Sequence, residues 1–300
     1  MKREYFGERL KHIRQLKGIT QSQLAENVCS QSMLSRIEKG ETEATTYICI
    51  SLADKLGIGL NELLFEGESP TDQGIKQIKE DLRNAARRSD YSLIKNIVKS
   101  QKNNSTFNSS IILKQFLKWH EAIYIYYLEK DLEGAKLIIE KALNYTNYSS
   151  KKELSQQELG LLISLSIFYA EEGEEHQTIN LLEETLTKIK KKIGETDTTL
   201  LLRIYYNLSK ALHNTHQYRK SIKYAVSGLN LSIRKEHLYL TGELHYQHGE
   251  CLSRLNQKNQ AIEELKKAQW IFERIEMYNL VKVVKRHVEM IINDEGIPFE

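Results

Sequence analysis

The sequence predicts an all-α protein with a small N-terminal helical domain and a larger domain of stacked helical hairpins. Apolar residues recur every three or four positions over most of the 300 residues, as in amphipathic helices. Only two prolines occur, Pro70 and Pro298, and both lie at the edges of such stretches, where proline does not interrupt a helix. Pairs of small residues also recur at regular intervals in the second half, which indicates a helical repeat.

Composition limits the possible classes of function. The chain is 40% hydrophobic, yet no run approaches the roughly 18 apolar residues of a membrane span, and the first residues lack a secretory signal. Cys29, Cys49 and Cys251 are scattered, as expected for free thiols in a reducing compartment. No phosphate loop, metal-spaced cluster or nucleophile constellation is visible. We therefore expect a cytoplasmic protein that is not an enzyme and needs no cofactor or metal.

The first two helices of the N-terminal domain follow from periodicity and capping residues. Phe6, Leu10, Ile13 and Leu16 recur at helical spacing, and Gly18 is a plausible helix stop. A second, short helix is expected over about 21–27, because Thr20 and Gln23 have the spacing of a capping box. The net charge of +3 indicates little by itself, but residues 1–17 carry six basic side chains against two acidic ones. This basic edge could attract phosphates.

Three further helices complete this domain, which we place at residues 1–68. Ser30 caps a third helix of about 31–39, which Gly40 closes, and a fourth and a fifth follow over about 46–56 and 60–66. The stretch from Gly67 to Gly74 is the only sustained break in apolar periodicity. We therefore expect a linker over 69–75 and a second domain over 76–300.

Four segments of the second domain begin a helix with a small residue and place another one seven positions later. The pairs are Ala135/Ala142, Thr178/Thr185, Ser221/Gly228 and Ala261/Ala268, spaced by 43, 43 and 40 residues. Small residues two turns apart let a neighbouring helix approach closely, as stacked hairpins require. The pattern predicts a right-handed superhelix of about five degenerate tetratricopeptide-like hairpins, including an early one over 76–104, and a capping helix over 278–293.

The third helix has the pattern of a recognition helix, which in a helix-turn-helix enters the major groove of DNA. Leu34 and Ile37 face inward, whereas the predicted DNA-contacting side chains form a polar face. These are Gln31, Ser32, Ser35, Arg36 and Lys39, with Gln21 placed at the start of the second helix to support phosphate binding. Such side chains can bond base edges or phosphates, and an arginine can pair with guanine. A merely solvated face is the alternative.

These segments carry a family resemblance. Residues 20–26 (TQSQLAE) followed by 34–40 (LSRIEKG) resemble the Cro/repressor-type helix-turn-helix, and the resemblance covers about 2–66. It implies that Arg14 and Glu38 form a buried ion pair that locks the first helix to the third, with direct DNA contact as the alternative role. The turn before Ser30 is one residue shorter than in most of that family, so individual base contacts are not carried over.

A row of polar residues lies on the helices that precede the four small-residue pairs. This polar row stands 14 positions before each pair and consists of Glu121, Ser164, Asn207 and Gln247. The neighbouring positions, 13 and 10 before, are mostly apolar and are expected in the core. The first helices of stacked hairpins line the concave surface, and an amide can pair with both the C=O and the N–H of a peptide. The row predicts a track for an extended peptide, with an ordinary solvated face as the alternative.

The repeat helices resemble those of PlcR-type peptide-responsive quorum-sensing regulators, in particular residues 206–212 (YNLSKAL) and 246–252 (YQHGECL). The resemblance spans essentially the whole chain. It implies a short signalling peptide as ligand, a homodimer, and a near-palindromic operator in double-stranded DNA. It also implies that Arg87, Asn207 and Glu243 contact the peptide.

The chain departs from that family at two peptide-contacting positions. Isoleucines at 163 and 167 stand on a helix where the family carries an asparagine, and Leu280 replaces a tyrosine. We therefore expect a different peptide. The predicted peptide-binding set is Arg87, Glu121, Ser164, Asn207, Glu243 and Gln247.

Three hypotheses follow for function. The first is a DNA-binding transcription regulator, expected to be an activator, whose repeats bind a signalling peptide that shifts the arrangement of the dimeric DNA-binding heads. The second is a DNA-binding regulator whose repeats bind a protein or a small molecule. The third is a repeat scaffold that does not bind DNA.

Overall fold

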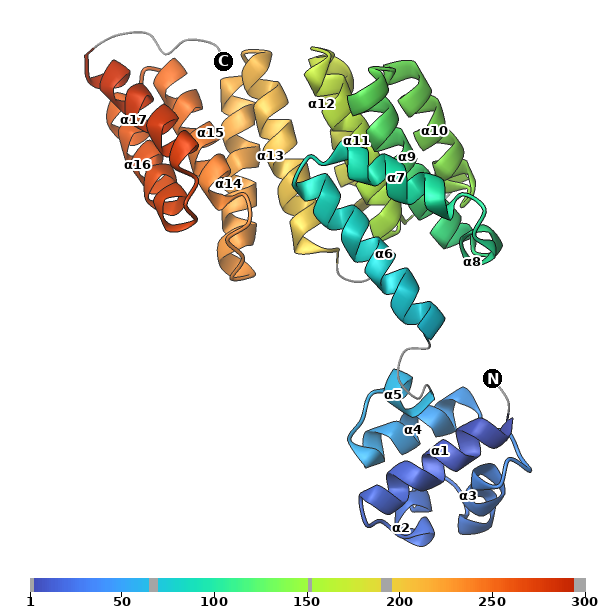
Figure 1. Cartoon of the computed structure of the whole chain (residues 1–300). Coiled ribbons are helices and arrows are strands. Elements are labelled where there is room, and N and C mark those ends of the chain that lie inside the picture. Colours follow the sequence, from blue (N-terminus) through green and yellow to red (C-terminus); the bar gives the residue numbers. More distant parts are fainter. Residues whose placement is uncertain (1–2, 65–69, 151–152, 190–195, 294–300) are drawn as a thin grey trace. The chain divides into compact units, whose positions relative to one another are not determined.

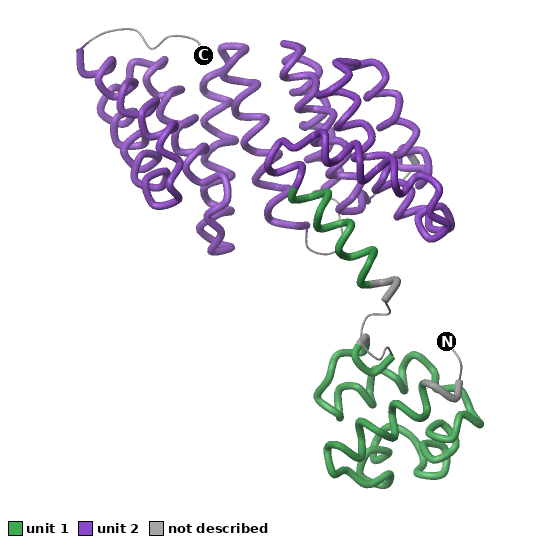
Figure 2. The backbone as a smooth tube through the Cα atoms, viewed as in Figure 1, with its two compact units in different colours: residues 1–84 green, residues 85–300 purple. Residues whose placement is uncertain are grey.

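The computed structural model describes residues 3–64, 70–150, 153–189 and 196–293, and every regular element in these ranges is helical. The chain divides into two compact units, residues 1–84 and 85–300 (Figure 2). The all-α class predicted from periodicity is therefore confirmed.

The N-terminal part contains five short helices (Figure 1). They are α1 (Arg3–Leu16), α2 (Gln21–Ala25), α3 (Gln31–Glu38), α4 (Thr46–Leu56) and α5 (Leu60–Leu64). The predicted helices agree with these bounds to within about two residues, and the predicted end of the fifth helix lies outside the described residues. Their apolar faces meet in one core, which includes Leu10, Leu24, Leu34, Ile37 and Leu52.

Local capping explains where α2 and α3 begin. The Thr20 hydroxyl accepts a hydrogen bond from the backbone N–H of Gln23, whose side chain in turn accepts one from the Thr20 backbone N–H. This is the predicted capping box. The Ser30 hydroxyl accepts from the Met33 N–H at the start of α3. Gly18 and Gly40 have φ of 67° and 72°, which an L side chain rarely adopts, and so they end the preceding helices.

The second part is a row of antiparallel helical hairpins. Helix α6 (Pro70–Arg87) begins in the first unit and ends in the second. The other helices of the second unit are α7 (Tyr91–Gln101), α8 (Ser105–Ser109), α9 (Ile111–Glu129), α10 (Leu132–Asn144), α11 (Gln156–Glu171), α12 (Glu175–Ile189), α13 (Thr198–Asn214), α14 (Tyr218–Arg234), α15 (Thr241–Arg254), α16 (Lys258–Arg274) and α17 (Tyr278–Ile292). Figure 1 shows the hairpins standing side by side from α9 and α10 to α16 and α17. The predicted capping helix corresponds to α17. The range predicted for an early hairpin contains the end of α6 and all of α7, and the boundary between the two compact units falls within α6.

The paired small residues occupy the packed faces of α10, α12, α14 and α16. All eight are buried, and the first of each pair is the fourth residue of its helix. A Cβ built on Gly228 would lie 2.8 Å from a Leu244 methyl on α15, so a larger residue here would require the Leu244 side chain to shift. The repeat read from the sequence therefore reflects close packing between successive hairpins.

The expected linker differs from the structure. Residues 65–69 lie outside the described residues, and residues 70–75 form the first turns of α6 instead of an irregular segment. Proline is well tolerated at the first position of a helix, because its fixed φ suits the helix and its missing N–H has no partner there. The break in apolar periodicity therefore marked the start of a polar helix.

Candidate functional site

Helix α3 presents the predicted DNA-contacting face to solvent. Gln31, Ser32, Arg36 and Lys39 are exposed and Ser35 is half-buried, whereas Leu34 and Ile37 are buried in the core. Arg36 lies 4.0 Å from the Glu41 carboxylate. Both side chains are mostly exposed, so this ion pair is weak and leaves Arg36 able to bind elsewhere. The structure brings the four predicted residues within α3, and Lys39 directly after it, onto one accessible surface.

A buried ion pair joins α1 to the last turn of α3. Arg14 Nε and Nη2 donate to the two carboxylate oxygens of Glu38 at 2.6 and 2.9 Å, and Nη1 donates to the Ile19 carbonyl at 2.9 Å. The hydrogen bond to Glu38 raises the pKa of Arg14 against the opposing effect of burial. The ion pair implied by the family resemblance is therefore confirmed, and Arg14 is enclosed within the domain.

Gln21 connects this ion pair to the start of the recognition helix. Its amide nitrogen donates to Glu38 Oε2 at 2.7 Å, and its amide oxygen accepts from the Gln31 side chain at 2.8 Å. The sequence predicts that Gln21 supports phosphate binding. The structure adds an internal role, because the same amide orients Gln31. Sequence reasoning missed this contact, since helical spacing does not reveal how side chains from two helices meet.

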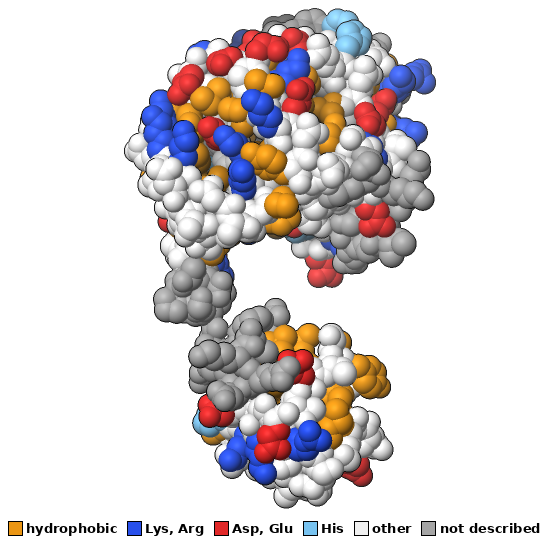
Figure 3. All heavy atoms as spheres, turned by 90° about the vertical axis from the view of Figure 1, so that its right-hand side faces the viewer, with side chains coloured by type: hydrophobic (Ala, Val, Ile, Leu, Met, Phe, Trp, Pro, Cys, Tyr) orange, Lys and Arg blue, Asp and Glu red, His pale blue; other side chains and the backbone are white. Residues whose placement is uncertain are grey.

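The predicted basic edge is smaller than the sequence indicates. Arg14 is buried, and Arg9 donates through Nε and Nη2 to the Glu62 carbonyl, which ties α1 to α5. Lys11 and Lys17 remain exposed. On the face drawn in Figure 3, basic side chains of this unit lie together with acidic ones beside them. Among the side chains that the structure describes on or next to α1 and α3, Lys11, Lys17, Arg36 and Lys39 are exposed and carry positive charge available for phosphates.

The structure buries two of the four side chains in the polar row. Ser164 on α11 is 5% exposed, and its hydroxyl accepts a hydrogen bond from the Trp119 indole at 2.8 Å. Gln247 on α15 is 4% exposed and donates to Cys251 Sγ at 3.9 Å. The predicted peptide track therefore cannot expose all four side chains of the polar row, and the prediction is corrected for Ser164 and Gln247. The row lies one residue from an apolar core position, so a large neighbour such as Trp119 can cover it.

The other two members of the row are partly accessible. Glu121 on α9 forms an ion pair with Lys118 one turn earlier. Asn207 on α13 is half-buried, and its amide has no hydrogen bond to the rest of the described chain. Arg87, the last residue of α6, is exposed. Asn207 is therefore the member of the row whose amide is available to a ligand.

Three ionisable side chains near Asn207 are partly buried. Burial lowers the pKa of Arg203, one turn before Asn207, and the phenols of Tyr239 and Tyr127 act weakly in the opposite direction. Burial raises the pKa of Tyr206 to about 12, with a further contribution from the negative charges of Glu243 and Glu250.

Burial also raises the pKa of Glu243 itself. The predicted set omitted Arg203 and Tyr206, although Arg203 lies on the same helix face as Asn207, at i and i+4. That spacing was the signal that could have found it.

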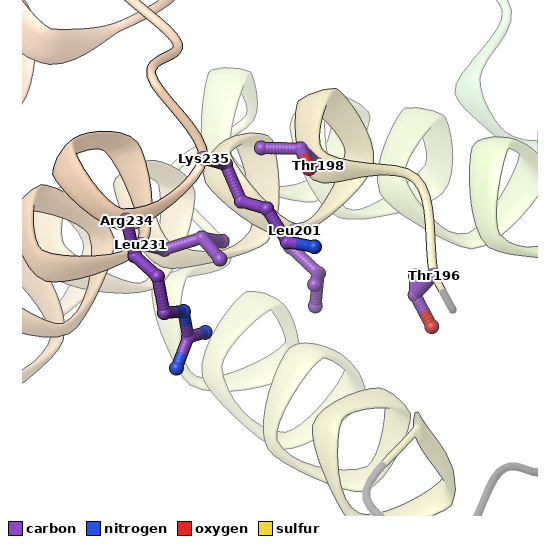
Figure 4. A pocket seen from close by; sticks show the side chains of 6 residues that line it. All are labelled: Thr196, Thr198, Leu201, Leu231, Arg234 and Lys235. Carbon is purple, nitrogen blue, oxygen red and sulfur yellow. The ribbon is translucent and has the colours of Figure 1, made fainter. Parts of the chain in front are cut away.

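A separate pocket of about 360 Å³ lies between the start of α13 and the end of α14 (Figure 4). Its lining consists of Thr196, Thr198, Leu201, Leu231, Arg234 and Lys235. None of the predicted site residues lines it.

Two histidines on α15 share an internal partner. His245 and His248 both contact Glu264 Oε2, at 2.7 and 3.1 Å, and Lys267 donates to the same carboxylate. Burial would raise the pKa of Glu264, but these three hydrogen bonds outweigh it and lower the pKa. Within the described ranges, no group of three or more His, Cys, Asp or Glu side chains could hold a metal ion.

No helix among the described residues is long and apolar enough to cross a membrane.

Comparison with known proteins identifies both parts of the chain. A helix-turn-helix domain matches residues 10–63, and the RNPP family C-terminal domain matches residues 79–290, which is more than half of the chain. The chain belongs to the RNPP family. This RNPP protein is thus a helix-turn-helix regulator of transcription in a family of peptide-responsive quorum-sensing proteins, and not an enzyme.

Solved structures of PlcR resemble this RNPP protein over nearly its whole length. PlcR of Bacillus thuringiensis in complex with the peptide PapR7 and DNA is 29% identical with a TM-score of 0.74, covering 94% of this chain and 99% of that one. Apo PlcR of the same organism is 25% identical with a TM-score of 0.63, covering 98% of this chain and 100% of PlcR.

A third solved structure shares the fold at lower identity. The Streptococcus dysgalactiae pheromone receptor Rgg2 is 17% identical with a TM-score of 0.63, covering 95% of this chain and 98% of Rgg2. No curated protein sequence matches the chain.

Proposed function

We propose that this RNPP protein is a sequence-specific activator whose repeat domain, residues 76–300, binds a short signalling peptide. The domain at 1–68 would read a near-palindromic operator as part of a homodimer, through Gln31, Ser32, Ser35, Arg36 and Lys39 with Gln21 in support. The peptide would act by binding one arrangement of the two DNA-binding heads more tightly than the other.

The observation that carries the peptide half of this proposal is Asn207. A half-buried amide with no partner in the described chain has lost part of its hydration without replacing those hydrogen bonds. An extended peptide offers a C=O and an N–H that would satisfy both amide atoms. The likeness to PlcR, which was crystallised with a peptide and DNA, supports the same assignment.

Other predicted peptide contacts divide into two groups. Glu243, Glu121 and Arg87 retain accessible surface and stay in the proposed set. Ser164 and Gln247 are buried, so we propose that they hold the packing behind the contact surface. This division rests on burial and on the hydrogen bond from Trp119 to Ser164.

The test is a mobility shift at fixed salt, using a DNA duplex that the full chain selects from a random-sequence library. Adding the small secreted peptides from the culture medium should change the affinity for that duplex. Failure to select any duplex would overturn the DNA half of the proposal. A duplex affinity that no secreted peptide changes, together with no peptide bound by calorimetry, would overturn the peptide half.

A second candidate is a regulator whose repeats bind a small molecule. The pocket between α13 and α14 favours it, because about 360 Å³ lined by threonine, leucine and two cations suits a small anionic ligand. Substitution of Leu231 by tryptophan would fill this pocket. If peptide still changes the affinity for DNA after this substitution, the result supports a peptide as the ligand of the repeats.

A further inference from the structure

Arg203 occupies a distinctive place on the first helices of the repeat. Arg203 stands before the Ser221/Gly228 pair at a fixed distance in the sequence. The residues at the same distance before the other three small-residue pairs form one column with it, and they are Leu117 on α9, Gly160 on α11 and Glu243 on α15. Arg203 is therefore the single cation in this column, and it lies one turn before Asn207 on the same face of α13. A ligand that reaches the Asn207 amide also reaches the Arg203 guanidinium.

No hydrogen bond or ion pair joins Arg203 to the rest of the described chain, although the side chain is partly buried. Arg14 provides the contrast within the same protein, because its guanidinium makes two bonds to Glu38 and one to a carbonyl. A guanidinium has five N–H donors in a fixed plane. Those of Arg203 are oriented toward no carboxylate that the described chain supplies.

The surrounding electrostatics leave this charge uncompensated. Burial lowers the pKa of Arg203, so the protein around it disfavours the cation. Burial also raises the pKa of Glu243, the nearest acid in the same column, and no ion pair links the two side chains. The free protein therefore holds a desolvated cation without the partner that usually offsets its cost.

We infer that Arg203 binds a carboxylate of the peptide ligand, so that the recognised peptides carry a free C-terminus or an acidic side chain at the level of α13. This inference rests on the proposed peptide-binding function and names the chemical class of its ligand. Guanidinium and carboxylate form two parallel charge-assisted hydrogen bonds, which give both affinity and selectivity. Glu243 repels such a group from α15, which fixes where along the repeats the carboxylate lies.

The test measures binding of defined synthetic peptide pools to the full chain by calorimetry. One pool has free C-termini and no Asp or Glu, a second has amidated C-termini with Asp or Glu, and a third is amidated and contains neither. The wild-type chain should bind the first or the second pool at least about tenfold more tightly than the third, as expected for one charge-assisted contact. The preferred pool tells which of the two carboxylates is used.

Arg203→Met removes the charge and keeps the volume, so it should abolish the preference between pools. Arg203→Lys should keep part of the preference, and Arg219→Met on the exposed face of α14 should keep all of it. If the wild-type chain binds peptides but Arg203→Met leaves the preference intact, this inference fails alone. If the wild-type chain binds no pool, both the inference and the peptide-binding function fail.

Thermal unfolding without peptide gives an independent readout. Because the unpaired guanidinium is desolvated, Arg203→Met should raise the midpoint temperature. A lower midpoint would show that Arg203 has a stabilising partner in the free protein, and it would overturn the inference.

Discussion

Arg14 and Glu38 form a two-bond ion pair that closes the helix-turn-helix domain, with N···O distances of 2.6 and 2.9 Å and both side chains buried. The pair ties α1 to the end of α3. Gln21 donates a hydrogen bond to Glu38 and accepts one from the exposed amide of Gln31, so it connects the ion pair to Gln31. The stability of the domain and the orientation of its recognition helix therefore depend on the same carboxylate.

Glu38→Ala should destabilise the N-terminal domain by about 3–5 kcal/mol, because it leaves the Arg14 charge buried without a partner. Hydrogen exchange at the amides of Leu10, Leu34 and Leu52 in the full chain measures this locally. The double variant Arg14→Met/Glu38→Leu should recover most of the loss. Equal destabilisation by the single and the double variant would contradict this account.

Arg36→Ala should weaken binding to the selected duplex by roughly 1–3 kcal/mol, as expected for one base-contacting arginine. Glu41→Ala is the matched control, because it removes the weak partner of Arg36 and a negative charge beside the proposed DNA-contacting face. It should leave affinity unchanged or increase it slightly. A mobility shift at fixed salt compares the two variants, and unchanged affinity of Arg36→Ala would remove it from the contact surface.

Asn207→Ala should abolish the response of DNA binding to peptide and leave the repeat domain folded. Asn230→Ala, on the exposed surface of α14, makes the same chemical change away from the first helices and should respond as the wild type does. Calorimetry and circular dichroism separate binding from folding. Retained peptide affinity in Asn207→Ala would show that its amide is not a peptide contact.

Gly160→Ala should destabilise the repeat domain by about 1–3 kcal/mol through overpacking, because a Cβ there would lie 2.3 Å from the Trp119 ring. The Trp119 fluorescence should change with it. Gly74→Ala in α6 meets nothing within 4 Å and should stabilise its helix by about 0.5–1 kcal/mol. In thermal unfolding, Gly160→Ala should lower the midpoint temperature and Gly74→Ala should raise it, which separates the effect of packing from that of helix propensity. If both substitutions change the midpoint in the same direction, the packing argument is refuted.

His213 should make the stability of the repeat domain depend on pH. Burial lowers the pKa of His213 in the folded chain, so the unfolded chain takes up its proton first as the pH falls. The stability contributed by the neutral imidazole is fully present above the unfolded pKa, near 6.5, and is lost as the pH falls through the folded pKa.

Urea unfolding at pH 7.5 and pH 5.5 tests this dependence. His213→Gln should lose less stability between these values than the wild type does, whereas the exposed His176→Gln should match the wild type. An unaltered pH dependence in His213→Gln would rule out this histidine as the source.

Most of the fold was predictable because its signals are local. The capping residues Thr20 and Ser30, the left-handed Gly18 and Gly40, and the spaced small residues act within a few positions of the helices that they define. The candidate site was predictable only in part. Helical spacing identified the exposed face of α3 and the accessible amide of Asn207, but it also selected Ser164, which the structure buries.

The sequence by itself determined where the helices begin and end and which of their faces are apolar, since capping, backbone freedom and hydrophobic periodicity are properties of neighbouring residues. Only the tertiary structure decided which polar side chains already have partners. The partners of Gln21 and Ser164 lie 17 and 45 positions away in the chain, at Glu38 and Trp119. Such contacts depend on how close two packed helices bring their side chains, and this distance leaves no periodic trace in the sequence.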